Sequence, residues 1–217
     1  MNKFPTFLIM AIAMVLAGCS SETVSYNRGV YMLIDTSGTY AQELVKAQHI
    51  VNFTLSKLDP ADSFAVASVD TGSFSEKDII AKVTFDDRPS RANQQKRKFR
   101  QEVDAYVKGV KSSPYTDITG GILQAIEFLN EADTGRKTIL IFSDLKEELK
   151  KGYIRDIPLQ LNGFDVVALN VTKLRSDNID PREYMDRLEE WRKKVEAGGG
   201  TWRVINDLER LESILDN

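Results

Sequence analysis

The sequence contains very little of the two residue types that form disulfides, zinc clusters and many catalytic sites. Among its 217 residues there is one cysteine, Cys19, and one histidine, His49. A single cysteine excludes an internal disulfide, and one cysteine with one histidine cannot build a zinc site from several Cys and His side chains. The position of the only histidine within a predicted helix argues against a Ser-His-Asp catalytic set. His49 falls in a stretch with helical spacing of apolar residues, so we interpret it as a surface or boundary residue of a helix rather than a ligand.

Excess positive charge, internal repeats and low-complexity segments are also missing. The formal net charge is −3, and this mild acidity argues against a nucleic-acid partner, whose recognition needs clustered positive charge. About two hundred residues without a repeat suit one domain, and a chain of that length buries roughly 70% of the surface that it exposes when unfolded.

Long apolar runs are absent except at the amino terminus. Lys3 supplies a positive charge, and an apolar run extends from Phe4 to Leu16. This run is about a dozen residues long, whereas a helix needs about 20 residues to cross the ~30 Å hydrocarbon core of a bilayer. We therefore predict that residues 1–18 are a signal peptide, not a membrane-spanning helix.

The end of this segment, Leu16-Ala17-Gly18-Cys19, resembles the bacterial lipobox. The resemblance implies cleavage before Cys19 and acylation of its thiol and its new amino group; the alternative is a secretory signal with a cysteine here by chance. Several acyl chains make a stable membrane anchor, so residues 19–27 would be a short tether and residues 28–217 the exported domain. Cleavage removes Lys3 and no acidic residue, which leaves a net charge of −4. Ser20, in place of aspartate, implies by resemblance to Gram-negative lipoproteins the outer membrane, facing the periplasm.

A metal-binding loop is predicted near the start of the domain. An uninterrupted apolar run from Val30 to Ile34 ends in Asp35, and Ser37 and Thr39 follow in a tight turn. Such a run is typical of a parallel strand buried on both faces, and ligands of these sheets gather at the carboxyl ends of the strands. One carboxylate and two hydroxyls at alternate positions can point at one centre. These hard oxygens are the donors that Mg²⁺, Mn²⁺ or Ca²⁺ prefers.

Two later segments offer further oxygen ligands. Thr116 stands just before a helical pattern, where its hydroxyl can turn outward. Asp144 follows the apolar run from Thr138 to Phe142, so it repeats the arrangement at Asp35. Each segment alone is consistent with an Asx turn, a helix cap or a strand end. The three segments together indicate a shared site.

Asp35-Thr36-Ser37-Gly38-Thr39, Thr116-Asp117-Ile118 and Ser143-Asp144 together resemble the von Willebrand factor type A domain and its metal-ion-dependent adhesion site. The resemblance covers residues 28–217 and implies that one ion is bound by Asp35, Ser37, Thr39, Thr116 and Asp144. It also implies that the hydroxyls bind the ion directly and that a carboxylate binds it directly or through water. Leu145 follows Asp144 where a glycine is common in the family, so we expect this loop to be less flexible.

The remaining patterns predict a three-layer, Rossmann-like α/β sandwich: a mostly parallel central sheet with one antiparallel edge strand, and helices on both faces. Strands are predicted at residues 30–34, 63–69, 79–85, 138–142, 165–171 and 202–205, and helices at 41–58, 88–110, from 122, from 181 and at a closing segment containing Leu208, Leu211 and Leu215. The connection after residue 69 is too short for a crossover helix, so the strand at 79–85 should be antiparallel at an edge.

Three groups of polar residues have more than one interpretation. Asp70 and Thr71 would lie on the metal side, either as partner contacts at the rim of the site or as a solvated turn. Lys146-Glu147-Glu148 is interpreted as surface charge. The basic first half of the 88–110 helix could be a solvated face, a dock for anionic lipid headgroups or lipopolysaccharide, or a protein contact.

The predicted function is binding, not catalysis. If hydroxyls and water contact Mg²⁺ while the two carboxylates balance its charge, the ion stays electrophilic at one open position, which suits a carboxylate of a protein partner. A second possibility is a structural module with an unused metal site. A third is a haloacid-dehalogenase-like phosphatase with Asp35 as nucleophile, but Ser37 stands where the second acid would be needed and is a poor acid or base.

Overall fold

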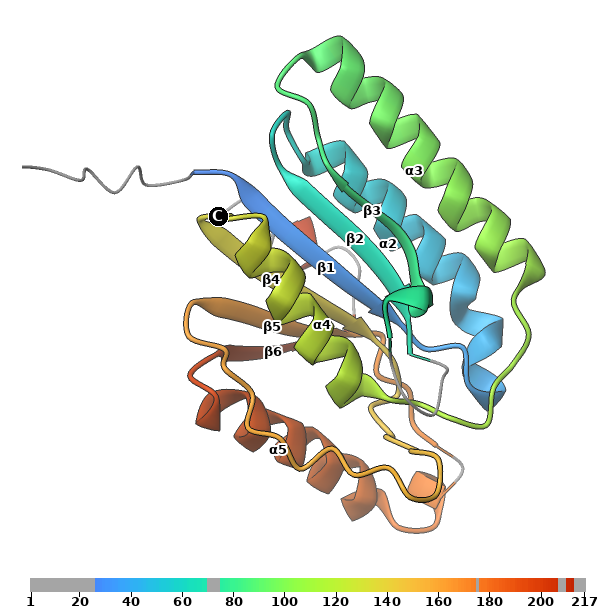
Figure 1. Cartoon of the computed structure of the whole chain (residues 1–217). Coiled ribbons are helices and arrows are strands. Elements are labelled where there is room, and N and C mark those ends of the chain that lie inside the picture. Colours follow the sequence, from blue (N-terminus) through green and yellow to red (C-terminus); the bar gives the residue numbers. More distant parts are fainter. Residues whose placement is uncertain (1–25, 70–74, 175, 207–209, 213–217) are drawn as a thin grey trace, which may run out of the picture.

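A computed structural model describes residues 26–69, 75–174, 176–206 and 210–212, without the side chains of residues 39, 41 and 42 (Figure 1). In this part of the chain, six strands form one sheet in the order β3-β2-β1-β4-β5-β6. The strands are β1 (Arg28–Ile34), β2 (Ser63–Ser68), β3 (Ile79–Thr84), β4 (Arg136–Phe142), β5 (Phe164–Leu169) and β6 (Thr201–Ile205). All neighbours are parallel except β2 and β3, which confirms the predicted sheet with an antiparallel edge strand.

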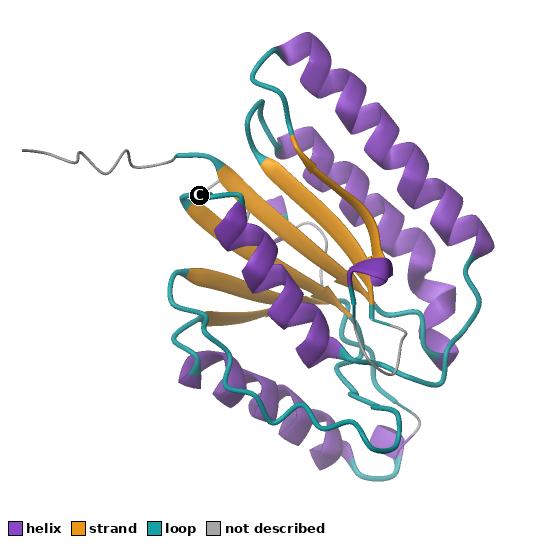
Figure 2. Ribbon diagram, in the orientation of Figure 1, coloured by secondary structure: helices purple, strands orange, loops and turns teal. Residues whose placement is uncertain are grey.

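Helices cover both faces of this sheet, as Figure 2 shows. They are α2 (Leu44–Lys57), α3 (Pro89–Gly109), α4 (Ile118–Glu131) and α5 (Pro181–Ala197), and short 3₁₀ turns occur at Gly38–Glu43, Glu76–Asp78 and Ser176–Asn178. Helices α2 and α3 pack on one face and α4 and α5 on the other, so the predicted three layers are confirmed. Within the described residues, no helix has the length and apolar character needed to cross a membrane.

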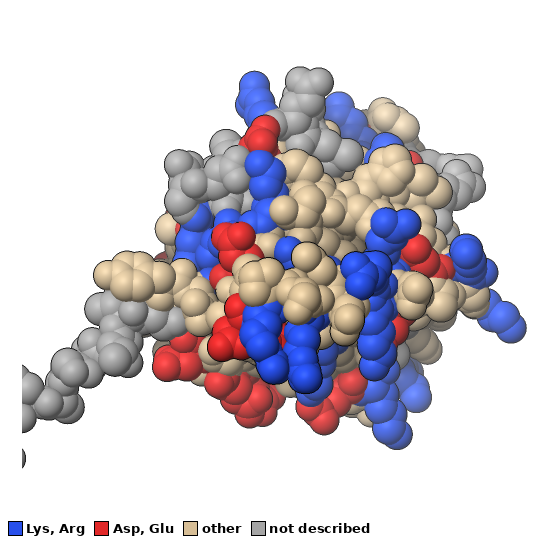
Figure 3. Space-filling model, turned by 90° about the horizontal axis from the view of Figure 1, so that it is seen from above, with Lys and Arg blue, Asp and Glu red and all other residues tan. Residues whose placement is uncertain are grey.

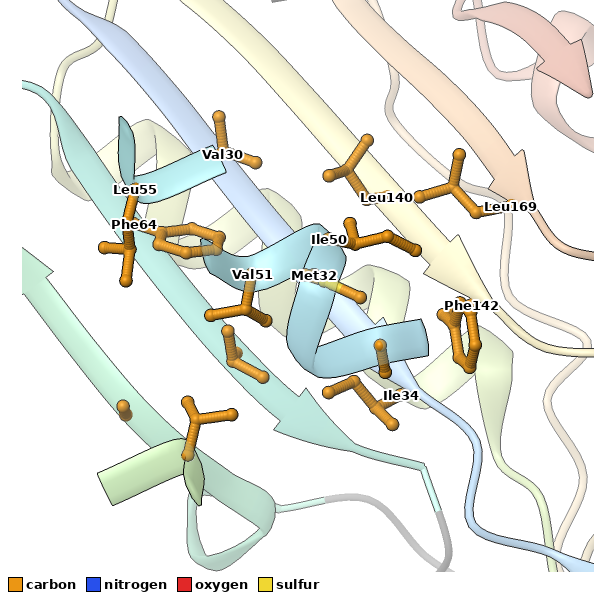
Figure 4. Packing of buried hydrophobic residues seen from close by; sticks show 14 of the residues in the cluster. Val30, Met32, Ile34, Ile50, Val51, Leu55, Phe64, Leu140, Phe142 and Leu169 are labelled. Carbon is orange, nitrogen blue, oxygen red and sulfur yellow. The ribbon is translucent and has the colours of Figure 1, made fainter. Parts of the chain in front are cut away.

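The two faces of the sheet bury separate hydrophobic cores because side chains alternate along each strand. From β1, Val30, Met32 and Ile34 join the core beneath α2 and α3. Tyr31 and Leu33 join the core beneath α4 and α5. Figure 4 shows the first of these cores, with side chains of β1 and its neighbours meeting those of α2. This double burial explains why the run from Val30 to Ile34 contains no polar residue.

The connection between β4 and β5 is long and contains no helix. Residues from it nevertheless enter the second core, namely Leu145, Leu159 and Leu161. They cover part of the sheet face that a crossover helix would otherwise cover. Of the three positions of the predicted closing helix, only Leu211 lies within the described residues, and it is buried. Leu208, Leu215 and the predicted signal peptide lie outside them.

Candidate metal centre

The strands that carry the predicted ligands end at the same level of the sheet. Ile34, the last residue of β1, pairs with Phe142 of β4 and with Ser68 of β2. The backbone N–H of Asp35 donates to the carbonyl of Phe142 at 2.9 Å, and that of Val69 donates to the carbonyl of Ile34 at 3.1 Å. The loops that follow β1, β2 and β4 therefore start side by side at the carboxyl edge, as the sequence predicts.

The carboxylate of Asp35 joins the first loop to the third. Its side chain is fully buried. One carboxylate oxygen accepts the backbone N–H of Ser37 at 2.8 Å, and the other accepts the hydroxyl of Ser143 at 2.6 Å. The first contact shapes the turn after β1, and the second spans 108 positions of the chain. Ser143 thus holds Asp35 in place, a role that sequence reasoning did not assign to it.

The second loop is held between the other two. The backbone N–H of Gly38 donates to the carbonyl of Ser113 at 3.3 Å, and Thr116 and Glu148 exchange two backbone hydrogen bonds of 2.8 and 2.9 Å. Thr116 is 1% exposed. Its place in the loop that lies between the first and the third loops fits a metal ligand.

Asp144 has a perturbed titration because of its surroundings. Its side chain is 6% exposed, and one carboxylate oxygen accepts the backbone N–H of Lys146 at 2.9 Å. Burial is the main cause that raises its pKa to about 6, and the charge of Asp35 raises it further, against the lowering effects of the Lys146 N–H and of Arg187. The effect of Asp35 means that the two carboxylates are near enough to repel each other, so a cation in their vicinity is electrostatically favoured.

Leu145 adopts a backbone conformation that usually belongs to glycine. Its φ is +68°, in the left-handed region that costs a residue with a Cβ roughly 1–2 kcal/mol. The conformation is held from three sides. Its N–H donates to the Ser143 hydroxyl at 2.9 Å, its carbonyl accepts the indole N–H of Trp191 at 2.9 Å, and its side chain is buried in the second core. The residue that departs from the family pattern thus keeps the glycine-like turn and adds an anchor.

Arginines from distant segments support the loops, and sequence reasoning missed them. Arg155 forms a two-pronged ion pair with the fully buried Asp117, with contacts of 3.1 and 2.7 Å. Asp117 also caps α4 by accepting the Gly120 N–H at 2.8 Å. From α5, Arg187 donates to the carbonyl of Asp144 at 2.8 Å and pairs with Asp177, whose pKa it lowers.

Glu147 was interpreted as surface charge, but the structure gives it a specific contact. It is half-buried, and it accepts the backbone N–H of Thr119 at 2.7 Å and the hydroxyl of the same residue at 3.0 Å. These bonds satisfy donors in the first turn of α4, where a negative charge is also favoured by the helix dipole. Glu147 therefore fastens the third loop to α4.

The structure brings Asp35, Ser37, Thr116 and Asp144 to one edge of the sheet. The backbone of Thr39 lies in the 3₁₀ turn directly after Ser37, while its side chain is outside the described part of the chain, as are Asp70, Thr71 and Cys19. No three His, Cys, Asp or Glu residues gather as a metal cluster within the described residues. A metal site here therefore depends on hydroxyl ligands, which suit a hard cation such as Mg²⁺.

Comparisons with known proteins agree with this fold. No protein-family model and no curated protein matches the sequence. Among solved structures, a von Willebrand factor type A protein from Catenulispora acidiphila superposes with a TM-score of 0.55 at 17% identity, over 88% of this chain and 41% of that chain. The pilus adhesin SpaC from Lactobacillus rhamnosus GG, in its open conformation, superposes with a TM-score of 0.55 at 11% identity, over 90% of this chain and 30% of that chain. This chain thus spans less than half the length of either protein, and it has the von Willebrand factor type A fold.

Proposed function

We propose that the protein is a lipid-anchored module of the bacterial envelope that binds a protein partner through a divalent cation. The cation, Mg²⁺ or alternatively Mn²⁺ or Ca²⁺, is held by Asp35, Ser37, Thr39, Thr116 and Asp144. The observation that carries the proposal is the position of two buried carboxylates, those of Asp35 and Asp144, and the buried Thr116 at the carboxyl ends of neighbouring strands.

The donor set favours binding over bond making. Hydroxyl oxygens withdraw little of the positive charge of Mg²⁺, so the ion attracts an anionic ligand at an open position of its octahedral shell. A carboxylate of the partner fits that position. The Asp35 carboxylate is buried and both of its oxygens accept hydrogen bonds, which suits a positioning role better than nucleophilic attack on a phosphate.

The proposed place of the module in the cell envelope rests on the sequence. Acylation of Cys19 would anchor the chain to a membrane, and Ser20 favours the outer membrane, facing the periplasm. One structural relative is a pilus adhesin, which is consistent with a contact-forming role. The short tether would keep the domain near the bilayer, at most about 30 Å away if its nine residues are fully extended.

Titration calorimetry of the full chain with Mg²⁺ tests the metal site. We expect Asp35→Ala and Thr116→Val to abolish or strongly weaken the binding. Thr138→Val is the matched control, because Thr138 is a buried threonine in β4 that lies near the opposite edge of the sheet. Absence of divalent-cation binding by the unaltered chain would overturn the proposal, and so would equal binding by all three variants.

A structural module with an unused metal site is the second candidate. It is favoured by the direct hydrogen bonds between the loops, which join Gly38 to Ser113 and Thr116 to Glu148 without an ion. A pull-down from envelope extract, in Mg²⁺ and in chelator, distinguishes the two candidates. A partner that is retained in chelator and by Thr116→Val supports the structural module, whereas loss under both conditions supports the metal-dependent one.

A further inference from the structure

The first half of α3 is strongly basic and exposed. From Pro89 to Gln101 the helix has no acidic residue and five basic ones, which are Arg91, Lys96, Arg97, Lys98 and Arg100. Arg91 and Arg97 are exposed and form no ion pair with any described residue. Lys98 and Arg100 reach Glu102 and Asp104 only at 3.7 Å, in exposed contacts that contribute little. Most of this charge is therefore available to a partner.

This basic half lies at the end of the sheet where the parallel strands begin, whereas the candidate metal centre lies at their carboxyl ends. We call the former the amino edge of the sheet. The register places Thr84, at the end of β3, beside Ser63, and Ser63 beside Gly29 at the start of β1. Helix α3 begins at Pro89, shortly after Thr84, and it runs from this edge toward the other (Figure 1).

The basic half and the segment where the described chain begins both contact the end of α2. The ammonium of Lys96 donates to the carbonyl of Leu58, and the guanidinium of Arg28 donates to the neighbouring carbonyl of Lys57. Arg28 lies two residues after Tyr26, the first described residue. The basic half of α3 and the exit of the chain toward Cys19 thus occupy the same edge.

We infer that the basic half of α3 is a docking surface for anionic phospholipid headgroups. Charge complementarity favours this occupant, because Lys and Arg side chains are attracted to anionic headgroups within a Debye length of roughly 10 Å at 0.1 M salt. Figure 3 looks onto the upper side of Figure 1, and Lys and Arg side chains predominate on its right-hand side. In this orientation the metal loops point away from the bilayer, toward a partner. The inference does not depend on metal binding.

Vesicle co-sedimentation of the full chain tests this surface. Phosphatidylcholine vesicles with and without phosphatidylglycerol are compared at low and high salt. Any binding through the apolar amino-terminal segment occurs in all samples, so the difference between the two kinds of vesicle measures the electrostatic part. We expect phosphatidylglycerol to strengthen the binding and salt to reverse this gain. Replacing Arg91, Arg97, Lys98 and Arg100 together by Gln should weaken the phosphatidylglycerol-dependent part by at least about tenfold.

The matched control removes the same number of charges from the metal-side edge, by changing the exposed residues Lys108, Lys111, Lys150 and Lys151 to Gln. We expect this variant to bind like the unaltered chain. Circular dichroism verifies that both variants are folded. If the fourfold variant of the basic half does not fold, single replacements of Arg91 or Arg97 by Gln are used in its place. Equal weakening of vesicle binding by the two fourfold variants would show attraction through net charge alone and would overturn the inference. Equal binding of the unaltered chain to both kinds of vesicle would also overturn it, and so would weakening by the control variant alone.

Discussion

Two buried aspartates at opposite ends of the strands, Asp62 and Asp144, differ in what surrounds their carboxylates. At the amino edge, Asp62 is 3% exposed and accepts three hydrogen bonds, from the backbone N–H of Arg28 at 2.7 Å, the guanidinium of Arg28 at 3.1 Å and the N–H of Asp59 at 2.7 Å. At the carboxyl edge, Asp144 is similarly buried, but the nearby charge of Asp35 adds to the effect of burial and raises its pKa to about 6.

The difference lies in where the compensating positive charge comes from. Asp62 receives it from Arg28, and Asp117, although it lies at the carboxyl edge, receives it from Arg155. The charge of these two aspartates is matched within the chain, so removing either partner of each pair should destabilise the fold. For Asp144 and Asp35 our proposal assigns the matching charge to a bound divalent cation. Substitutions should therefore separate structural aspartates from metal-binding ones.

The largest effect is expected at the amino edge. Asp62→Ala removes a buried carboxylate that accepts the backbone N–H and the guanidinium Nε of Arg28 and the N–H of Asp59, and should lower the free energy of unfolding by about 3–5 kcal/mol. Urea unfolding measures this loss. Asp59→Ala is the control, because the Asp59 side chain is 79% exposed and its pair with Arg28 should contribute less than about 1 kcal/mol. Equal losses in the two variants would contradict the structural role of Asp62.

A similar loss is expected at the second loop. Arg155→Met leaves the charge of Asp117 buried without its partner, and should lower the free energy of unfolding by about 2–4 kcal/mol, with or without Mg²⁺. Lys151→Met, an exposed change in the same connection, is the control and should have little effect. If Mg²⁺ restored the stability of Arg155→Met, the comparison between structural and metal-binding aspartates would fail.

The sequence predicts the ligand loops because their residues are close neighbours after apolar runs. Val30 to Ile34 and Thr138 to Phe142 place Asp35 and Asp144 at strand ends by strand periodicity alone, and parallel pairing then brings the ends together. The predicted strand and helix boundaries differ from the observed ones by a few residues at most where both are described, as at β5, which ends at Leu169 rather than residue 171.

The supporting contacts could not be predicted in this way. The hydrogen bond from Ser143 to Asp35 spans 108 positions and the ion pair from Arg155 to Asp117 spans 38 positions, so no local pattern records them. The left-handed φ of Leu145 is also invisible in the sequence, because leucine rarely adopts it. It follows from the contacts that hold this residue. Local patterns therefore identify the candidate ligands, and only the packed structure identifies the contacts that position them.

Substitution of Asp144 should change the free energy of unfolding in the opposite direction to substitution of Asp62. Without metal and near neutral pH, Asp144→Asn removes a buried charge that is repelled by Asp35, and should raise the free energy of unfolding by about 1–3 kcal/mol. The same change should remove the stabilisation that Mg²⁺ gives to the unaltered chain. Thermal unfolding with and without Mg²⁺ measures both effects, and Glu148→Gln, which alters an exposed carboxylate of the same loop, is the control. Destabilisation by Asp144→Asn in the absence of metal would place Asp144 with the structural aspartates.

The smallest effect is a dependence of stability on pH. The folded-state pKa of Asp144, about 6, lies above the ordinary aspartate value of 3.8, so the folded protein binds this proton more tightly than the unfolded chain does. The resulting stabilisation is fully present below the unfolded pKa and is lost as the pH rises through about 6. Without metal, the unaltered chain should therefore lose about 1–2 kcal/mol relative to Asp144→Asn between about pH 5 and pH 7.5. Bound Mg²⁺ should offset this loss, because the ion requires the ionised carboxylate and binds better as the pH rises. The measurement is the free energy of unfolding against pH for the unaltered chain and for Asp144→Asn. If the two curves had the same slope, Asp144 would not titrate in this range.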